Sequence, residues 1–139
     1  MPEIKRIHHI AILVNDIETS LKFWQDILGI ELSHISDMPN EAARIAFLPL
    51  GESEIELVQP VTSDSGLSRF LEKRGPGMHH LCLEVDDLQR WLKKLKTRGL
   101  QLINEKPKVA EDGRLYAFIH PMSTNGVLVE LYQLPKYLK

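Results

Sequence analysis

The feature that most constrains the fold of this 139-residue chain is a phrase that occurs twice in the sequence. The stretch KRIHHIAILVNDIETSLKFW begins at Lys5, and PGMHHLCLEVDDLQRWLKKL begins at Pro76. With an offset of 71 positions, the matched residues are Ile7 with Met78, His8 with His79, His9 with His80, Val14 with Val85, Asp16 with Asp87, Ile17 with Leu88, and Leu21 with Leu92. Internal similarity of this extent predicts two modules of the same kind.

The duplication continues beyond the shared phrase. An Ala-Phe pair at 46–47 aligns with an Ala-Phe pair at 117–118, and ELVQP from Glu56 returns as ELYQLP from Glu130. The offset has grown to 74 positions at these glutamates, which a longer hairpin turn at 123–126 explains. Two copies are too few for a repeat solenoid, so we expect a pseudo-symmetric pair of modules.

Each copy has the order strand, helix and further strands, which predicts a βαβββ module in an α+β fold. The first helix is predicted to follow an N-cap at Asp16 and to end at Gly29. The second is predicted to follow Asp86 or Asp87 and to end at Gly99. Apolar residues at helical spacing define the buried faces, with Ile17, Leu21, Trp24 and Leu28 in the first helix and Leu88, Leu92 and Leu95 in the second.

The remaining elements are expected from strand-like runs and turn residues. They are strands at 7–14, 43–50, 54–59, 113–120 and 127–133, a loop at 34–40, and turns at 51–53 and 122–126. Module one spans about 5–60 and module two about 77–135, and the linker at about 61–76 holds a short helical pattern at Leu67, Phe70 and Leu71. We therefore expect residues 1–139 to form a single domain.

Each module contributes one histidine and one glutamate at equivalent places on its first and last strands. Strand side chains alternate between faces, so the histidines of the two copies take equivalent faces, and each glutamate alternates with apolar neighbours. If the modules pair about their pseudo-symmetry axis, the four side chains can converge as a His2Glu2 set. The set consists of His9, Glu56, His80 and Glu130.

Two imidazoles and two carboxylates suit a divalent ion such as Co²⁺, Ni²⁺, Mn²⁺ or Zn²⁺. A single histidine at a strand start is more often a packed core residue, and a single glutamate often faces water. The duplication favours a metal site, because core packing gives no reason for both copies to keep ionisable residues in apolar strands. Four protein ligands leave two positions of an octahedron for a bidentate substrate.

The composition excludes several classes of protein. Apolar residues make up 43% of the chain and charged residues 26%, which is typical of soluble globular proteins. A net charge of -2 argues against a nucleic-acid binder, and no apolar run is long enough for a membrane helix. The lone Cys82 cannot form an internal disulfide, and no signal-peptide pattern follows Met1, so we expect a cytoplasmic protein.

Four stretches carry a family resemblance that covers nearly the whole chain. HHIAILVNDIETSLKFWQDILGI is similar to many members of the vicinal oxygen chelate (glyoxalase/bleomycin resistance/dioxygenase) superfamily. More specific are FLPLGESEIELVQP, FLEKRGPGMHHLCLEVDD and FIHPMSTNGVLVEL, which together resemble the methylmalonyl-CoA epimerase family.

This resemblance implies a glyoxalase-like fold with a metal-binding cleft, an acyl-CoA substrate, a homodimer, and a divalent metal on the His2Glu2 set. It also implies interconversion of (2R)- and (2S)-methylmalonyl-CoA, in which an α-proton is removed and returned on the opposite face through a metal-stabilised enolate. Some members carry a glutamate base where this sequence has Ile45. Glu130 is therefore the first candidate for the base, and a residue not yet placed or a bound water is the second.

Three other functions stay open at this level. A glyoxalase I-like isomerase (lactoylglutathione lyase) shares the metal and the proton transfer, and Glu56 does not discriminate, because epimerases often have glutamine there whereas glyoxalase I often has glutamate. An extradiol dioxygenase uses iron with two histidines and one carboxylate, so a fourth ligand argues against it. A metal-free small-molecule-binding resistance protein commonly lacks the ligand set. The run KKLKTR from Lys93 fits either a solvated helix face or a contact with coenzyme A phosphates.

Overall fold

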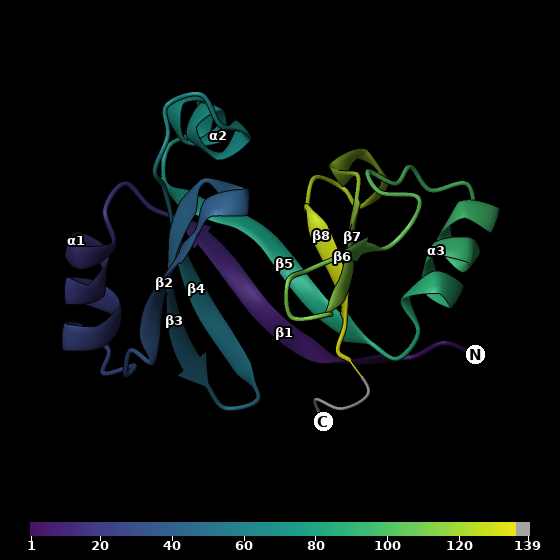
Figure 1. Cartoon of the computed structure of the whole chain (residues 1–139), viewed down its shortest axis with the longest axis horizontal. Helices are drawn as coiled ribbons and strands as arrows, with labels where there is room; N and C mark the ends of the chain where they lie inside the picture. Colours follow the sequence, from purple (N-terminus) through teal and green to yellow (C-terminus); the bar gives the residue numbers. More distant parts are fainter. Residues whose placement is uncertain (136–139) are drawn as a thin grey trace. The chain divides into compact units, whose positions relative to one another are not determined.

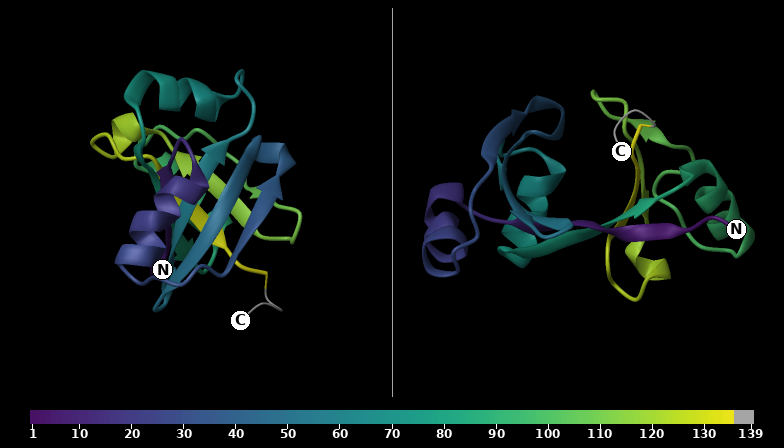
Figure 2. Two further views of the ribbon diagram at one scale, coloured as in Figure 1. Left: turned by 90° about the vertical axis from the view of Figure 1, so that its left-hand side faces the viewer. Right: turned by 90° about the horizontal axis from the view of Figure 1, so that it is seen from below.

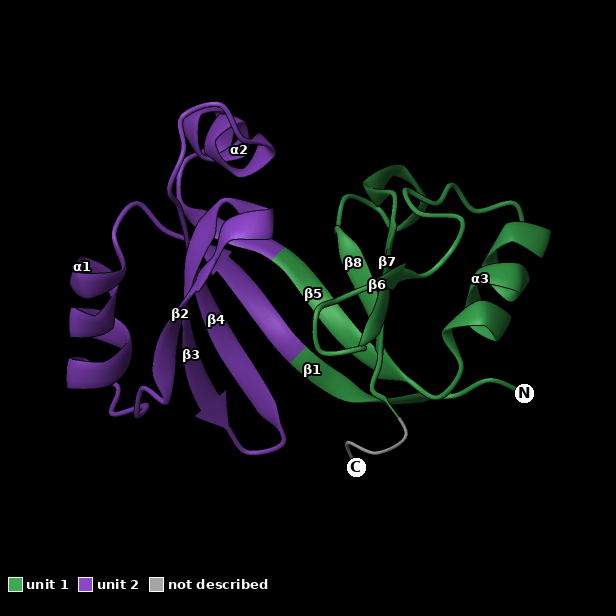
Figure 3. Ribbon diagram, in the orientation of Figure 1, with its two compact units in different colours: residues 1–8, 80–139 green, residues 9–79 purple. Residues whose placement is uncertain are grey.

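The computed structural model describes residues 1–135, and the chain divides into two compact units (Figure 3). Unit 2 is the continuous segment His9–His79. Unit 1 combines Met1–His8 with the chain from His80 onward. Within the described residues, no helix is long and apolar enough to cross a membrane.

The sheet of unit 2 follows the strand order β2-β3-β4-β1 (Figure 1). These strands are His34–Met38, Ala43–Leu50, Ser53–Pro60 and Ile4–Leu13, the last of which begins in unit 1. Strand β1 runs parallel to β4, with Ala11 opposite Glu56, whereas β3 is antiparallel to both β2 and β4. The predicted βαβββ order and the strands expected at 43–50 and 54–59 are therefore confirmed.

The first helix begins where the sequence predicts but changes type along its length. Asp16 caps α1 (Ile17–Leu21) by accepting a hydrogen bond from the Thr19 N–H at 2.9 Å. The chain then continues as a π-helix, η1 (Lys22–Ile27), whose hydrogen bonds span one more residue than those of an α-helix. Leu28 follows this segment as its C-cap and is 51% exposed. Its predicted place on the apolar face is wrong.

The prediction of a loop at 34–40 is also wrong, because His34–Met38 form strand β2. The segment HISDM lacks the clean alternation of apolar and polar residues that identifies a strand in sequence. It becomes a strand because its backbone pairs with β3, with Ile35 opposite Ala46, at the edge of the unit 2 sheet. Tertiary pairing therefore overrides weak local preference here.

Apolar clusters cover the two faces of this sheet. On one face, Val14, Ile17, Ala46, Leu48 and Leu57 form a core against which Leu21 and Trp24 of the first helical segment pack. On the other face, Ala11, Leu13, Ala43, Ile45 and Val58 form a second core. Helix α2 (Gly66–Arg74) packs Leu67, Phe70 and Leu71 against this second core, which confirms the short helical pattern expected in the linker.

Unit 1 repeats the arrangement with the strand order β5-β8-β7-β6. These strands are Gly77–Val85, Val129–Gln133, Leu115–Ile119 and Lys108–Val109. Helix α3 (Leu88–Thr97) lies along one side of this sheet (Figures 1 and 2). Its leucines Leu88 and Leu92 are buried against Val85, Ala117 and Leu131, so its predicted apolar face is confirmed. Asp87 caps this helix by accepting a hydrogen bond from the Arg90 N–H at 3.1 Å.

A glutamine anchors the start of the helix in each module. The side-chain oxygen of Gln59 accepts a hydrogen bond from the Ile17 N–H at 2.9 Å, and that of Gln133 accepts one from the Leu88 N–H at 2.7 Å. Both glutamines stand three residues after the glutamate of the proposed ligand set. The duplication therefore extends to a tertiary hydrogen bond that fixes each helix to the last strand of its own sheet.

Ala42 has a backbone conformation that favours glycine, with φ of 52° after the short helix η2 (Pro39–Glu41). A left-handed conformation costs an L-residue with a Cβ about 1–2 kcal/mol, and glycine avoids most of this cost. We expect Ala42→Gly to raise the free energy of unfolding by about 0.5–1 kcal/mol, measured by urea denaturation. Ala110→Gly is the matched control, because Ala110 is not among the residues with positive φ, and it should destabilise the protein. Equal effects of the two changes would contradict the conformational argument.

Candidate metal centre

Unit 2 brings His9 and Glu56 together. The parallel pairing of β1 with β4 sets Ala11 opposite Glu56, so that the histidine two residues earlier faces the same side of the sheet. His9 Nδ1 lies 3.2 Å from Glu56 Oε2. Both residues are buried, with 5% and 8% exposure, beside the apolar core that α2 covers. His9 and Glu56 therefore lie next to each other on one face of the unit 2 sheet.

Unit 1 brings His80 and Glu130 together in the same way. Strands β5 and β8 are parallel, with Cys82 opposite Glu130, which repeats the register of unit 2. His80 Nε2 lies 3.1 Å from Glu130 Oε1, and Glu130 is 7% exposed. This pair lies on the face of the sheet away from the α3 core, because Glu130 alternates with Val129 and Leu131 of that core.

Each pair has a geometry and a chemistry that fit a divalent ion. Two ligand atoms that bind one ion at about 2.1 Å and at right angles lie about 3.0 Å apart. The histidine-to-glutamate separations of 3.2 Å in unit 2 and 3.1 Å in unit 1 agree with this value. Burying a carboxylate in apolar strands is costly unless a positive charge meets it, and a divalent cation supplies that charge. Nitrogen and oxygen donors of this kind suit Co²⁺, Ni²⁺, Mn²⁺ and Zn²⁺.

A phenylalanine flanks the glutamate in each unit, and sequence reasoning assigned these residues no role. Phe47 stands opposite Glu56 across β3 and β4, and Phe118 stands opposite Glu130 across β7 and β8. The Phe118 ring meets the ring of His80 edge-on, with centroids 5.5 Å apart. The sequence did contain a signal for these two phenylalanines, because the internal repeat aligns Phe47 with Phe118. Each aromatic ring places apolar surface next to a carboxylate, which strengthens the electrostatic interactions of that carboxylate.

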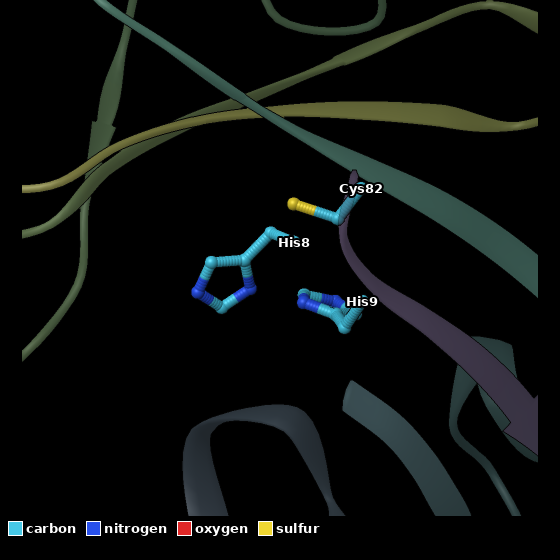
Figure 4. Close-up of side chains that lie close together, drawn as sticks. All are labelled: His8, His9 and Cys82. Carbon is cyan, nitrogen blue, oxygen red and sulfur yellow. The ribbon is translucent and has the colours of Figure 1, made fainter. Parts of the chain in front are cut away.

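Unit 1 carries a second row of polar residues beyond its histidine–glutamate pair. Glu84 is 7% exposed and accepts a 2.7 Å hydrogen bond from Arg6 Nε. Tyr132, opposite Glu84, accepts a 3.1 Å hydrogen bond from Arg114 Nη1, and its ring meets His8 with centroids 4.8 Å apart. His8 in turn lies close to the buried Cys82 (Figure 4). The equivalent row of unit 2 is apolar and packs under α2.

Burial raises the pKa of Tyr132 well above its ordinary value of 10.0. In a pH titration followed by tyrosinate absorbance, we therefore expect one tyrosine to ionise at a higher pH than the others. The variant Tyr132→Phe should lack this high-pH ionisation step. Unfolding frees Tyr132 to ionise near its ordinary pKa, so its neutral form contributes stability that is lost as pH rises above about 10. A single early step for all the tyrosines of the folded protein would contradict this assignment.

Ile45 lies on the same face of the unit 2 sheet as Glu56 and is 5% exposed. It stands opposite Val58 on β4, two residues along from the Phe47–Glu56 pair. Strand β3 carries no acidic residue, so it supplies no carboxylate base to this face. The departure noted in the sequence at Ile45 therefore leaves an apolar, packed side chain where some family members have a glutamate.

Comparison with known proteins identifies the family to which this chain belongs. Residues 8–118 match the model of the Glyoxalase/Bleomycin resistance protein/Dioxygenase superfamily. Mitochondrial methylmalonyl-CoA epimerase of Mus musculus is 35% identical over 132 residues, which cover 94% of this chain and 74% of the mouse protein. Ethylmalonyl-CoA/methylmalonyl-CoA epimerase of Cereibacter sphaeroides is 35% identical over 133 residues, 94% of this chain and 99% of that protein.

A solved structure agrees with these relatives. Methylmalonyl-CoA epimerase in complex with methylmalonyl-CoA and NH4+ superposes with a TM-score of 0.86 at 26% identity. The match covers 96% of this chain and 97% of that chain. Fold and sequence therefore point to the same group of proteins.

Proposed function

Because this chain belongs to the glyoxalase/bleomycin resistance/dioxygenase superfamily and, within it, to the methylmalonyl-CoA epimerase family, we propose that it interconverts (2R)- and (2S)-methylmalonyl-CoA. Its fold is the vicinal oxygen chelate fold that the sequence predicted. The observation that carries the proposal is the 35% identity to epimerases over 94% of the chain. The two buried histidine–glutamate pairs are consistent with it.

We propose that His9, Glu56, His80 and Glu130 together hold one divalent ion. Two carboxylates and two neutral imidazoles balance the charge of such an ion, which removes the cost of burying two isolated anions. A divalent ion bound there supplies positive charge for the oxygens of the substrate as the α-carbon loses its proton. The donor set suits cobalt, nickel, manganese and zinc alike, since all four accept nitrogen and oxygen ligands.

The residues of the chain have separate tasks in this proposal. Each histidine holds one ring nitrogen close to the glutamate oxygen of its own unit, so that both atoms could bind the same ion. We propose Glu130, rather than the equally buried Glu56, as the group that removes and returns the α-proton, and the strand with Ile45 offers no carboxylate for that task. A carboxylate that also binds a cation is a weakened base, so a bound water is the second candidate for this role.

The proposal is tested by proton NMR of methylmalonyl-CoA in deuterated water with protein supplied with Co²⁺. Epimerisation through α-proton removal predicts that deuterium enters the α-carbon and that one epimer is converted into the other. A hemithioacetal of glutathione and methylglyoxal serves as the competing substrate, because a glyoxalase I-like isomerase would act on it instead. No exchange with the acyl-CoA, together with turnover of the hemithioacetal, would overturn the epimerase assignment.

The assembly state is a separate proposal. We propose a homodimer on the family resemblance, and sedimentation velocity on the purified protein tests it. A monomer at the concentrations used for the NMR assay would contradict the dimer without affecting the epimerase proposal.

A further inference from the structure

The first histidine of each histidine pair has no part in the proposed His2Glu2 set. The repeat aligns His8 with His79, one position before each proposed histidine ligand. In the structure these two residues have different neighbours. The ring of His79 meets the ring of Phe70 in α2, with centroids 4.8 Å apart, whereas His8 lies close to the thiol of Cys82 (Figure 4). The two modules therefore differ in chemistry at this place.

His8 and Cys82 have the spacing of two ligands of one ion. Both residues belong to unit 1, His8 in β1 and Cys82 in β5. A ring nitrogen of His8 and the sulfur of Cys82 lie within 4.8 Å of each other. A thiolate sulfur and an imidazole nitrogen bind a metal at about 2.3 Å and about 2.0 Å, so on opposite sides of one ion they lie about 4.3 Å apart. A small adjustment of either side chain therefore brings both donors onto one ion.

The surroundings of this pair hold the two donors in place. The His8 ring meets the ring of Tyr132 edge-on, with centroids 4.8 Å apart. Cys82 is fully buried and stands opposite Glu130 in the register of β5 and β8. His8 is only half-buried, so the pair is open to solvent on the histidine side. Donors that are already fixed lose little conformational entropy when an ion binds.

From this geometry we propose that His8 and Cys82 form a second metal site, which takes a soft cation of the Cu⁺ class. Thiolate sulfur selects soft ions, and imidazole suits copper. Zn²⁺ takes four ligands in closed protein sites, whereas Cu⁺ is satisfied by two. The thiol proton passes to solvent as the sulfur–copper bond forms, and the copper keeps its oxidation state. The resulting thiolate–Cu⁺ unit is neutral, so its burial costs little.

The test is a competition titration of the full chain, supplied with Co²⁺, against the bicinchoninate complex of Cu⁺ without oxygen. We expect one Cu⁺ per chain and an unchanged Co²⁺ content, and copper X-ray absorption should show one sulfur and one nitrogen ligand. Release of one Co²⁺ for each Cu⁺ bound would place the copper on the His2Glu2 set and overturn the proposal. Failure to take Cu⁺ from the chelator would overturn it as well. No substrate is present, so the outcome is independent of the epimerase proposal.

Single variants assign the ligands. Cys82→Ala and His8→Asn should each weaken Cu⁺ binding about a hundredfold or more, because each removes one of two ligands, and even residues that only support a ligand contribute about 10–100-fold. Alanine is the residue that the repeat places at the equivalent position of the other module, Ala11, so Cys82→Ala should keep the fold. His79→Asn is the matched control and should bind Cu⁺ as wild type does. Equal weakening in His8→Asn and His79→Asn, or full affinity in Cys82→Ala, would contradict the assignment.

The repeat also provides a gain of binding as a test. Ala11 and His79, both in unit 2, take the places of Cys82 and His8. Ala11→Cys should therefore create a second site and raise the binding to two Cu⁺ per chain, and Ala11→Cys/His79→Asn should lose the added equivalent. Ala11→Ser is the control, since serine is similar in size but offers no thiolate. If Ala11→Cys is folded, as judged by thermal unfolding, and still binds only one Cu⁺, a histidine–cysteine pair at this place does not suffice and the proposal is wrong.

Discussion

Glu130→Gln is expected to lower the rate of epimerisation by about a thousandfold or more, while Glu56→Gln retains the rate within about tenfold. A thousandfold loss corresponds to about 4 kcal/mol of transition-state stabilisation, which is reasonable for a residue proposed both to bind the metal and to move the proton. Glutamine keeps an oxygen donor but cannot accept a proton at neutral pH. At Glu56, where the proposal requires only an oxygen ligand, the amide oxygen of glutamine is an adequate substitute.

The two variants are compared by deuterium entry at the α-carbon, by kcat and by the metal content of the purified proteins. Glu54→Gln is the control, because Glu54 lies on β4 two residues before Glu56, on the same face of the strand, and is not a proposed ligand. It should behave as wild type. Equal and large losses at Glu56 and Glu130 would contradict the division of tasks and would assign the proton transfer to another group. Full activity of Glu130→Gln with metal bound would exclude Glu130 as the base.

The elements that the sequence predicted well are those specified by local residues. Asp16 and Asp87 each cap a helix with a side-chain hydrogen bond, and caps of this type depend on a few adjacent positions. The π-helical turn at Lys22–Ile27 was missed, because its apolar spacing is also compatible with an α-helix and the choice depends on packing. Strand β2 was missed for the related reason that its pairing with β3 supplies what its own pattern lacks.

The candidate site was predictable to the extent that the duplication revealed it. Equivalent positions in two copies identified a histidine and a glutamate in each module, and the structure brings His9 to Glu56 and His80 to Glu130. The polar row of unit 1 was not predicted. The hydrogen bond from Arg114 to Tyr132 joins two residues that are distant in the sequence. The equivalent row in unit 2 is apolar, so the internal repeat gives no indication of the polar row in unit 1.

Removal of the metal is expected to abolish activity and to lower the stability of the folded protein. The number of metal equivalents bound, and the loss of stability in single variants, show whether the two histidine–glutamate pairs share one ion. A ligand present at a hundred times its dissociation constant stabilises the folded state by about 2.7 kcal/mol. If all four residues hold one ion, metal analysis of the reconstituted protein should give one equivalent per chain. His9→Ala and His80→Ala should then each abolish the rise in thermal stability on adding Co²⁺, although they belong to different units.

Two separate sites would give a different result. Each pair alone would offer only two protein ligands, so binding would approach two equivalents per chain, and each single variant would keep about half of the metal-induced stabilisation. His34→Ala is the control, since His34 is an exposed histidine on β2 and should leave both the equivalence and the stabilisation unchanged. Loss of all metal in both His9→Ala and His80→Ala, with one equivalent in wild type and control, requires that the ion be bound by both units together. That result would make each histidine–glutamate pair one half of a single metal site.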